Sequence, residues 1–355
     1  MRVSFLLAPV ASAFLVAACA DDPSSPAPDP VPPTTKAVYI LNEGQYGDPA
    51  GARLSLYDVD RDTLYADVYE SANGGAHLGS LGDDIVVRGD RAYVVMSGSH
   101  DLKIIGTADH RLLQSATYPG TDPHDVVISA DGTRMYLTML FSDSVLSIDP
   151  ATLAVRRGIR VGPNPQGMAL AGLRLFVCNS GFGSSRTVSV INTESEELLK
   201  TIELSDGPTG VAFAPDGSVW VTCTGNAYLG VPSTGRVFVI DGSTLTVRDS
   251  VVFPDQLFGP ITLGEDGYAY VLGVSPGSYY GGPVHRISMS TRQVTMNYVP
   301  GTYYALASEP GTANLYLSDA KNFAGAGEIR ILTPAGTVQR SFSAQRGPGK
   351  FAFTY

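Results

Sequence analysis

An all-β fold built from a repeated four-stranded unit is predicted by three features of this 355-residue sequence. Gly and Pro are abundant, at 39 and 24 residues, whereas charged residues make up only 16%, a composition typical of short strands joined by tight turns. A unit of about 43 residues recurs along most of the chain. Each unit contains four short apolar runs separated by turns, as in one blade of a β-propeller.

Residues 1–18 are expected to form an export signal. The segment begins with Arg2 close to the start and continues as an apolar stretch too short for a membrane span of roughly 20 residues. It ends in the run LVAAC at residues 15–19, which resembles the lipobox of bacterial lipoproteins. The resemblance implies lipidation of Cys19, whereas in an ordinary signal peptide this cysteine would be incidental.

The segment 19–36 is expected to be a tether. Residues 21–36 contain six prolines and no large apolar side chain except Val31, so this segment cannot bury a core. A lipidated Cys19 followed by such a spacer predicts a cell-envelope protein. It would be attached to the outer membrane through its N-terminal lipid alone, in the periplasm or exposed at the cell surface.

The repeated unit can be followed by the proline at the turn into each copy. These prolines are spaced 42, 43 and 52 residues apart, at Pro123, Pro165, Pro208 and Pro260. The longest interval contains an extra loop at 224–235. One turn is Asp-Gly in three units, at residues 131–132, 216–217 and 266–267. Gly tolerates positive φ there, so we assign these pairs to turn formation rather than catalysis.

Seven blades are predicted because one incomplete unit is completed by the end of the chain. Six units have four strands, but residues 38–69 supply only three, in the runs VYILNEG, RLSLYDV and LYADVY. The missing strand is available at 350–355. Pairing it with the first unit closes the ring and leaves no exposed edge between the first and last blades. The propeller is therefore expected to span residues 37–355.

The paired runs LFVCN at 175–179 and VSVIN at 188–192 resemble the YVTN repeat. The segment 37–355 thus resembles a YncE-like seven-bladed propeller. More narrowly, VYILNEG at 38–44 and GPTG at 207–210 resemble the surface propeller lipoproteins of Bacteroidetes-type envelopes. Some of those proteins capture cobalamin for an outer-membrane transporter. The resemblance implies a corrinoid as one ligand class, but it transfers no ligand-contacting residue to this chain.

One face of the ring is expected to carry the binding site. In a four-stranded blade, the loop between the second and third strands and the loop into the next blade emerge on the same face. These loops supply Tyr46, His77, His100, His124, Phe141, Gln166, Phe182, Tyr228, Phe258, Tyr279, Tyr280, Tyr303, Tyr304 and Phe323. Aromatic residues beside polar groups at a channel mouth favour a flat or large ligand, and packing at the blade junctions is the alternative.

No catalytic residue and no metal site are expected. The chain has no G-x-S-x-G turn, P-loop or H-E-x-x-H motif. Asp83 and Asp84 are adjacent carboxylates, but neighbouring strand residues point to opposite faces, so they should not act as a pair. The five histidines show no ligand spacing, including for a metal held by His124 and a carboxylate. Propellers nevertheless host lactonases and lyases, so an enzyme remains an alternative.

Cys178 and Cys223 are the cysteines other than Cys19. They lie on nearly equivalent second strands of consecutive units, and sheets roughly 10 Å apart strain the limit of about 7 Å between the Cα atoms of a disulfide. Two buried free thiols are expected. An oxidising compartment would still permit a disulfide.

The predicted function is binding of a ligand or partner on the loop-rich face by a monomeric propeller. The formal net charge of −10 argues against nucleic acid and anionic membranes as partners. A protein that captures a small molecule, with cobalamin the leading candidate and an outer-membrane transporter as partner, should have an aromatic pocket. A protein-interaction scaffold should have a flat apolar patch. An enzyme should have clustered carboxylates or histidines with shifted pKa values.

Overall fold

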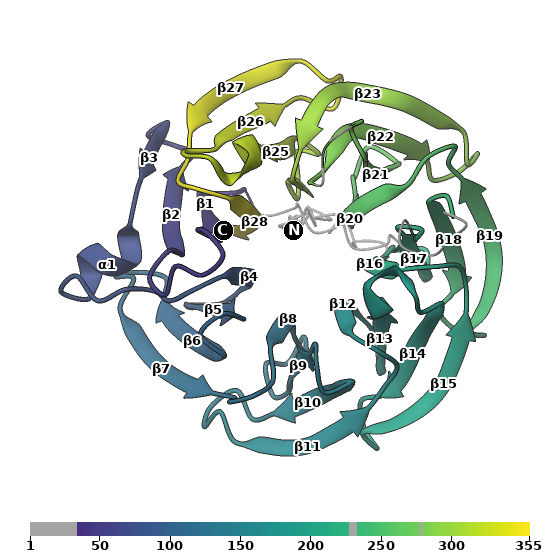
Figure 1. The fold of residues 1–355 in the computed structure, drawn as a ribbon, viewed down its shortest axis with the longest axis horizontal. Helices are drawn as coiled ribbons and strands as arrows, with labels where there is room; N and C mark the ends of the chain where they lie inside the picture. The colour runs from purple at the N-terminus through teal and green to yellow at the C-terminus, as the bar shows by residue number, and fades with distance from the viewer. Residues whose placement is uncertain (1–33, 227–232, 277, 279) are drawn as a thin grey trace, which may run out of the picture. The chain divides into compact units, whose positions relative to one another are not determined.

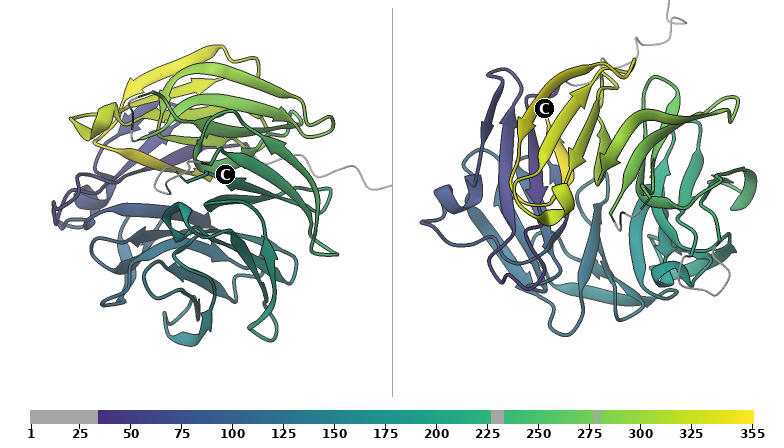
Figure 2. Two further views of the ribbon diagram at one scale, coloured as in Figure 1. Left: turned by 45° about the vertical axis from the view of Figure 1, so that its right-hand side comes forward. Right: turned by 45° about the horizontal axis from the view of Figure 1, so that its top comes forward.

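The computed structural model describes residues 34–226, 233–276, 278 and 280–355, which belong to the compact unit Pro33–Tyr355. These residues form seven four-stranded antiparallel sheets that follow one another in chain order around a common axis (Figure 1). Two tilted views show the sheets standing side by side around that axis (Figure 2). The prediction of a seven-bladed β-propeller is confirmed.

Blades 1 to 4 contain the strands of the N-terminal half and the last strand of the chain. Blade 1 consists of β1 (Ala37–Asn42), β2 (Arg53–Asp58), β3 (Thr63–Tyr65) and β28 (Pro348–Thr354). Blade 2 consists of β4 (Gly82–Arg88), β5 (Arg91–Met96), β6 (Asp101–Gly106) and β7 (Leu112–Thr117). Blade 3 consists of β8 (Pro123–Ile128), β9 (Met135–Met139), β10 (Ser144–Ile148) and β11 (Val155–Arg160). Blade 4 consists of β12 (Pro165–Ala171), β13 (Arg174–Asn179), β14 (Thr187–Asn192) and β15 (Glu197–Glu203).

Blades 5 to 7 complete the ring. Blade 5 consists of β16 (Pro208–Phe213), β17 (Ser218–Cys223), β18 (Arg236–Asp241) and β19 (Thr246–Val252). Blade 6 consists of β20 (Leu257–Leu263), β21 (Tyr268–Gly273), β22 (Gly282–Ser288) and β23 (Val294–Tyr303). Blade 7 consists of β24 (Ala305–Ser308), β25 (Leu315–Asp319), β26 (Glu328–Leu332) and β27 (Val338–Ser343). Three short helices accompany the strands: α1 (Val68–Ala72), η1 (Gly181–Gly183) and η2 (Lys321–Phe323).

The C-terminal strand closes the ring, as predicted. β28 pairs with β1 in antiparallel orientation, with Ala37 opposite Thr354 and Val38 opposite Phe353. In Figure 1 the yellow end of the chain lies next to the purple β1. Because β28 also contacts β4 of blade 2 and β24 of blade 7, the two ends of the repeat are joined through one strand.

The third strand of blade 1 is shorter than expected. The run LYADVY was predicted as a strand, but β3 ends at Tyr65 and helix α1 begins at Val68. Asp67, between them, has a positive φ of 53°, which ends the extended conformation. The side chains of Val68 and Tyr69 are buried between blades 1 and 2, so these residues contribute to packing between the blades rather than to strand pairing.

Apolar side chains fill the space between neighbouring blades. At the junction of blades 4 and 5, Phe176 and Cys178 of β13 pack in one cluster with Val219, Val221 and Cys223 of β17. Alternate residues of each strand enter such clusters because side chains alternate between the faces of a sheet. Both cysteines are buried and free, in agreement with the expected pair of thiols.

Candidate functional site

β-Bulges at one end of the inner strands turn polar side chains toward the central channel. The pairing register shifts between Gly82 and Asp84 in β4, and between Pro123 and Val126 in β8. Similar shifts occur near the same end of β12, β16, β20 and β28. A bulge adds an unpaired residue and breaks the alternation of side chains, so neighbouring residues can act on the same side.

The bulge in β4 breaks the strict alternation from which Asp83 and Asp84 were predicted to point to opposite faces. Asp83 Oδ1 lies 3.1 Å from Nδ1 of His124 on β8. Asp84 Oδ2 accepts a hydrogen bond of 3.0 Å from the backbone N–H of Val126 on the same strand. Both carboxylates therefore contact β8, because strict alternation does not hold across the bulge.

Six ionisable side chains from four segments form what we call the channel cluster. Its members are Glu43, Asp83, Asp84, His124, Asp125 and Lys350. Lys350 lies on β28, the inner strand of blade 1, and contacts β4, the inner strand of blade 2. Its Nζ is 3.2 Å from Asp84 Oδ1. A channel cavity of about 340 Å³ is lined by four members of the cluster and by Gln166 and Met168. The four members are Asp84, His124, Asp125 and Lys350.

Burial shifts the pKa values of the channel cluster. Burial and the nearby charge of Asp83 raise the pKa of Glu43 to about 8. Burial and Asp84 likewise raise the pKa of Asp125 to about 8. Burial would lower the pKa of His124, but its hydrogen bond to Asp83 and the charge of that carboxylate outweigh burial and raise it. For Lys350, Asp84 and Asp125 outweigh burial and raise the pKa.

Four aromatic side chains meet beside this cluster and form the aromatic mouth, defined as Phe258, Tyr280, Tyr304 and Phe323. The ring centroids of Tyr304 and Phe323 are 5.1 Å apart, and those of Tyr280 and Phe323 are 5.2 Å apart. Phe258 lies 5.6 Å from Tyr304. Phe258 lies near the start of β20, and the other three residues lie in the two kinds of loop that were expected to share one face, which we call the loop-rich face.

Tyr304 joins the aromatic mouth to the channel cluster. Its hydroxyl donates a hydrogen bond of 2.7 Å to Glu43 Oε1. Burial, followed by the charge of Glu43, raises the pKa of Tyr304 well above its usual value, so the phenol stays neutral and remains a donor. One side chain thus presents an aromatic ring to the mouth and a hydroxyl to the buried acid.

A left-handed turn holds Phe323 in place. Lys321, Asn322 and Phe323 of η2 have φ angles of 49°, 53° and 57°, a conformation that L-residues disfavour. The Phe323 ring packs where a side chain of Gly347 would lie, since a Cβ at Gly347 would be 2.5 Å from Phe323 Cε1. The turn and the contact with Gly347 together fix the position of the Phe323 ring.

Other predicted residues lie elsewhere on or below the same face. Phe182 pairs with Phe141 at a centroid distance of 5.9 Å, and both rings are at least half exposed. Tyr46 and His100 line a separate cavity of about 540 Å³, in which His100 Nδ1 lies 2.9 Å from Asp122 Oδ1.

Tyr303 and His77 are two further predicted residues that lie outside the aromatic mouth. Tyr303 is 2% exposed and packs in the core between blades 6 and 7, where its hydroxyl donates to the carbonyl of Pro300. His77 is exposed on the segment before β4. Tyr228 and Tyr279 lie outside the described residues, as does the lipidation site Cys19.

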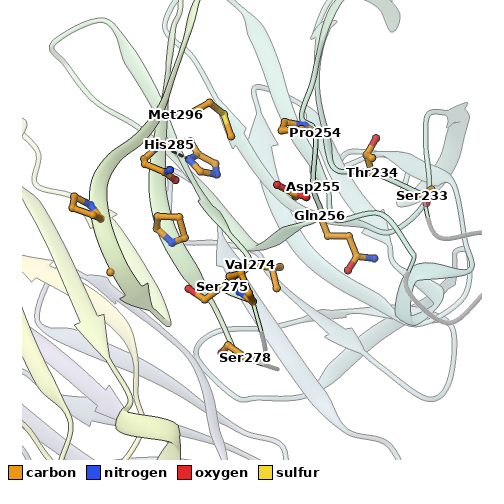
Figure 3. A pocket seen from close by; sticks show the side chains of 15 residues that line it. Ser233, Thr234, Pro254, Asp255, Gln256, Val274, Ser275, Ser278, His285 and Met296 are labelled. Carbon is orange, nitrogen blue, oxygen red and sulfur yellow. Dashed lines mark hydrogen bonds between the residues drawn. The ribbon is translucent and has the colours of Figure 1, made fainter.

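A larger cavity of about 760 Å³ lies beside blade 6 and is lined by none of the channel cluster (Figure 3). His285 of β22 forms part of its wall together with Asp255, Ser275 and Met296. The His285 ring is 4% exposed, stacks on a phenylalanine ring and accepts a hydrogen bond at Nδ1 from the backbone N–H of Asn297. These contacts give His285 a structural role.

Sequence reasoning missed Glu43, Asp83, Asp84, Asp125 and Lys350 as site residues. Lys350 was recognised only as part of the closing strand, and Asp83 and Asp84 were recognised only as an ineffective pair. The bulges that collect them on one channel wall carry no sequence signal of their own. Within residues 34–226, 233–276, 278 and 280–355, no group of three or more His, Cys, Asp or Glu side chains is arranged to hold a metal ion. No helix in this part of the chain is long and apolar enough to cross a membrane.

Together, the ring of blades and the mouth on its loop-rich face define a seven-bladed β-propeller suited to binding a ligand or a protein. More particularly, the chain belongs to the family described as "Domain of unknown function (DUF5074)", whose model matches residues 36–262. No curated protein matches the sequence.

Solved structures share the fold at low sequence identity. A quinonprotein alcohol dehydrogenase-like protein from Bacteroides thetaiotaomicron is 15% identical, with a TM-score of 0.69, over 90% of this chain and 78% of that one. Hydrazine synthase from Kuenenia stuttgartiensis is 19% identical, with a TM-score of 0.60, over 70% of this chain and 76% of that one. The computationally designed Ika8 protein is 12% identical, with a TM-score of 0.61, over 91% of both chains. At these identities the similarity concerns the fold alone.

Proposed function

We propose that this protein binds a small ligand at the aromatic mouth. The observation that carries the proposal is the position of Tyr304, whose ring belongs to the mouth and whose hydroxyl contacts Glu43 of the channel cluster. An apolar ring surface beside a few fixed polar groups is the usual composition of a small-molecule site. The ligand should therefore combine a flat apolar surface with polar substituents.

A corrinoid is the candidate we favour. Aromatic rings suit the flat macrocycle, and the hydroxyl and carboxyl groups of Tyr304 and Glu43 suit its peripheral amides. The resemblance of residues 38–44 and 207–210 to surface propellers that capture cobalamin supports the same ligand class. In this proposal an outer-membrane transporter receives the ligand.

The test is calorimetric titration of the purified protein with cyanocobalamin. Tyr304→Ala removes a central anchor and should weaken binding roughly thirtyfold, the equivalent of about 2 kcal/mol. Phe182→Ala is the matched control, since Phe182 is an exposed aromatic residue outside the mouth, and it should leave the affinity unchanged. Absence of heat and of a spectral change at micromolar protein would eliminate the corrinoid. Equal effects of both variants would eliminate the site.

We also propose attachment to the cell envelope through lipidated Cys19. The lipobox-like run at 15–19 and the proline-rich segment that follows it support this location. In cells, Cys19→Ala should move the protein from the detergent phase to the aqueous phase while the propeller still folds. A variant that partitions like the wild type would contradict the lipid anchor.

A second candidate function, catalysis, is favoured by the contact between Asp83 and His124. A carboxylate at Nδ1 fixes the imidazole tautomer and leaves Nε2 available as a general base, and Glu43 could supply a proton nearby. Hydrolysis of a lactone such as dihydrocoumarin tests this candidate. Turnover that is lost in His124→Ala would support an enzyme of lactonase type. Turnover no faster than in buffer would count against it.

A further inference from the structure

Glu43 has an unusual environment for an acidic side chain. Its Oε1 accepts the hydrogen bond from Tyr304, and a Cβ at Gly349 would lie only 2.4 Å from the same oxygen. The carboxyl group therefore lies directly against the backbone of β28. In the described part of the chain, no Lys, Arg or His side chain forms an ion pair with Glu43.

The neighbouring cations are engaged with other carboxylates. The elements packed around Glu43 contribute Asp83 and Asp84 from β4, His124 and Asp125 from β8, Lys350 from β28, and Tyr304 before β24. His124 contacts Asp83, and Lys350 contacts Asp84. The cluster thus contains four carboxyl groups, and only the Lys350 ammonium and the ionisable His124 imidazole can balance them, so a proton on a carboxyl group reduces the repulsion. The raised pKa of Glu43, about 8, agrees with this charge count.

The two carboxyl oxygens of Glu43 differ in their contacts. Among the described residues, no donor or acceptor forms a hydrogen bond with Glu43 Oε2. A protonated carboxyl group has one O–H donor, and Tyr304 already donates to Oε1, which leaves the proton for Oε2. We propose that Glu43 binds the ligand as a neutral carboxylic acid, with Oε2–H donating a hydrogen bond to a carbonyl or amide oxygen of the ligand.

This inference rests on the proposed ligand site and specifies the chemical group that the ligand places there. Buried carboxylic acids that stay neutral near pH 7 can serve as hydrogen-bond donors in enzymes. A ligand with an ammonium or guanidinium group would instead favour the ionised carboxylate. The two ligand classes therefore predict opposite effects of pH on affinity.

The first experiment measures the affinity for cyanocobalamin between pH 6 and pH 9. If only the neutral acid binds and its pKa is about 8, affinity should fall about tenfold between pH 7 and pH 9. Glu43→Ala should weaken binding at pH 6.5 and reduce the pH dependence, leaving only the contribution of other groups such as Asp125. Glu43→Gln should rescue much of that loss without restoring the pH dependence, because an amide N–H₂ can also donate. Affinity that rises with pH, or a Gln variant as weak as Ala throughout, would overturn the inference.

The second experiment does not depend on the corrinoid. Difference infrared spectroscopy of wild type against Glu43→Gln at pH 7 should show the band of a protonated carboxyl group. N-Methylacetamide, a simple amide, should shift that band, and the Tyr304→Phe variant should alter its starting position. If cobalamin fails to bind but both infrared results appear, the corrinoid is wrong and the neutral acid stands. If the band is absent or insensitive to the amide, the inference on Glu43 is wrong whatever the corrinoid does.

Discussion

At the scale of single residues, burial determines whether a charged side chain of the channel cluster forms an ion pair or takes up a proton. Lys350 lies within a strand and contacts Asp84, a carboxylate that is 6% exposed and also accepts a backbone N–H. Glu43 forms no ion pair with a described residue and accepts a hydrogen bond from the phenol of Tyr304 instead. A buried charge that loses its partner is costly, whereas a carboxyl group can avoid the cost by taking a proton.

Replacing Lys350 should therefore destabilise the propeller. In Lys350→Met the apolar length of the side chain is kept, but Asp84 is left without its cation. We expect a loss of about 1–2 kcal/mol in the free energy of unfolding, measured by urea denaturation, because Asp84 is buried whereas the Lys350 side chain is 36% exposed. Lys36→Met is the control, because Lys36 is exposed and its side chain forms no ion pair with the described residues. Equal stability of the two variants would show that the Lys350–Asp84 contact contributes little.

The stability of the protein should depend on the proton of Glu43. The pKa of Glu43 is about 8 in the folded state and 4.5 as its ordinary value, so between these pH values the folded state retains a proton that the unfolded state has lost. Stability from this group consequently decreases as pH rises from 4.5 to 8. Glu43→Gln lacks the titration, so its stability relative to wild type should increase over that range.

Thermal unfolding of wild type and Glu43→Gln at pH 5 and pH 8.5 measures this effect. Glu203→Gln, at an exposed position on an outer strand, is the matched control and should show no comparable change between the two pH values. A constant difference between Glu43→Gln and wild type would mean that Glu43 is ionised in the folded protein across the range.

At the scale of elements, the recurring Asp or Asn after the third strand of a blade has a structural cause. Asp149 Oδ1 accepts the backbone N–H groups of Ala151 and Thr152, which caps the turn into the fourth strand. Asn192 and Asp241 cap the corresponding turns in blades 4 and 5. The turns then pass through a residue with positive φ, which is Leu in blades 3 and 5. The capping residue is a sequence signal, whereas the positive φ of Leu153 and Leu245, whose side chains are buried in the core, appears only in the structure.

The left-handed turn η2 and Gly347 provide a test at the same scale. Gly347→Ala should cost the usual penalty of positive φ, about 1 kcal/mol, and should also displace the Phe323 ring. Gly172→Ala is the matched control, because the φ of Gly172 (60°) is close to that of Gly347 (66°). A Cβ at Gly172 would have no atom within 4 Å. Near-UV circular dichroism should change only for Gly347→Ala. Identical spectra and stabilities for the two variants would show that Phe323 is not held by this contact.

At the scale of the whole molecule, stability depends on ring closure by β28. This strand pairs with β1 and contacts β4 and β24, so its loss would expose the edge of β1 and remove Lys350 from the channel. Each blade buries its faces against its two neighbours. A defect in one blade therefore removes packing contacts from both neighbours and lowers the stability of the whole ring.

Removing residues 348–355 should abolish cooperative unfolding or lower the thermal midpoint by several degrees, since each kcal/mol shifts the midpoint of a domain of this size by about 1–2 °C. Removal of Tyr355 alone is the control and should change little, because Tyr355 lies beyond the end of β28. A truncated protein with an unchanged midpoint would show that the ring is stable without its closing strand.

The sequence by itself determined the architecture because repetition and alternation are local signals. Prolines at regular intervals, Asp-Gly turns and four apolar runs in each unit identified the blades, and the incomplete first unit identified 350–355 as the closing strand. Loop position also placed Phe258, Tyr280, Tyr304 and Phe323 on one face. One local run was misleading, since LYADVY contributes to β3 and α1 rather than to a full strand.

Only the tertiary structure decided which side chains form the site. Asp83, Asp84 and His124 converge because bulges interrupt the regular alternation of side chains between the two faces of a strand. The positions of these bulges depend on how the strands pair around the channel. Glu43 and Lys350 are more than 300 residues apart and meet only when β28 returns to β1. Tyr303 and Tyr304 are neighbours in sequence, yet one is buried between blades and the other contacts Glu43. Side-chain direction and burial depend on contacts between distant strands, and those contacts exist only in the closed ring.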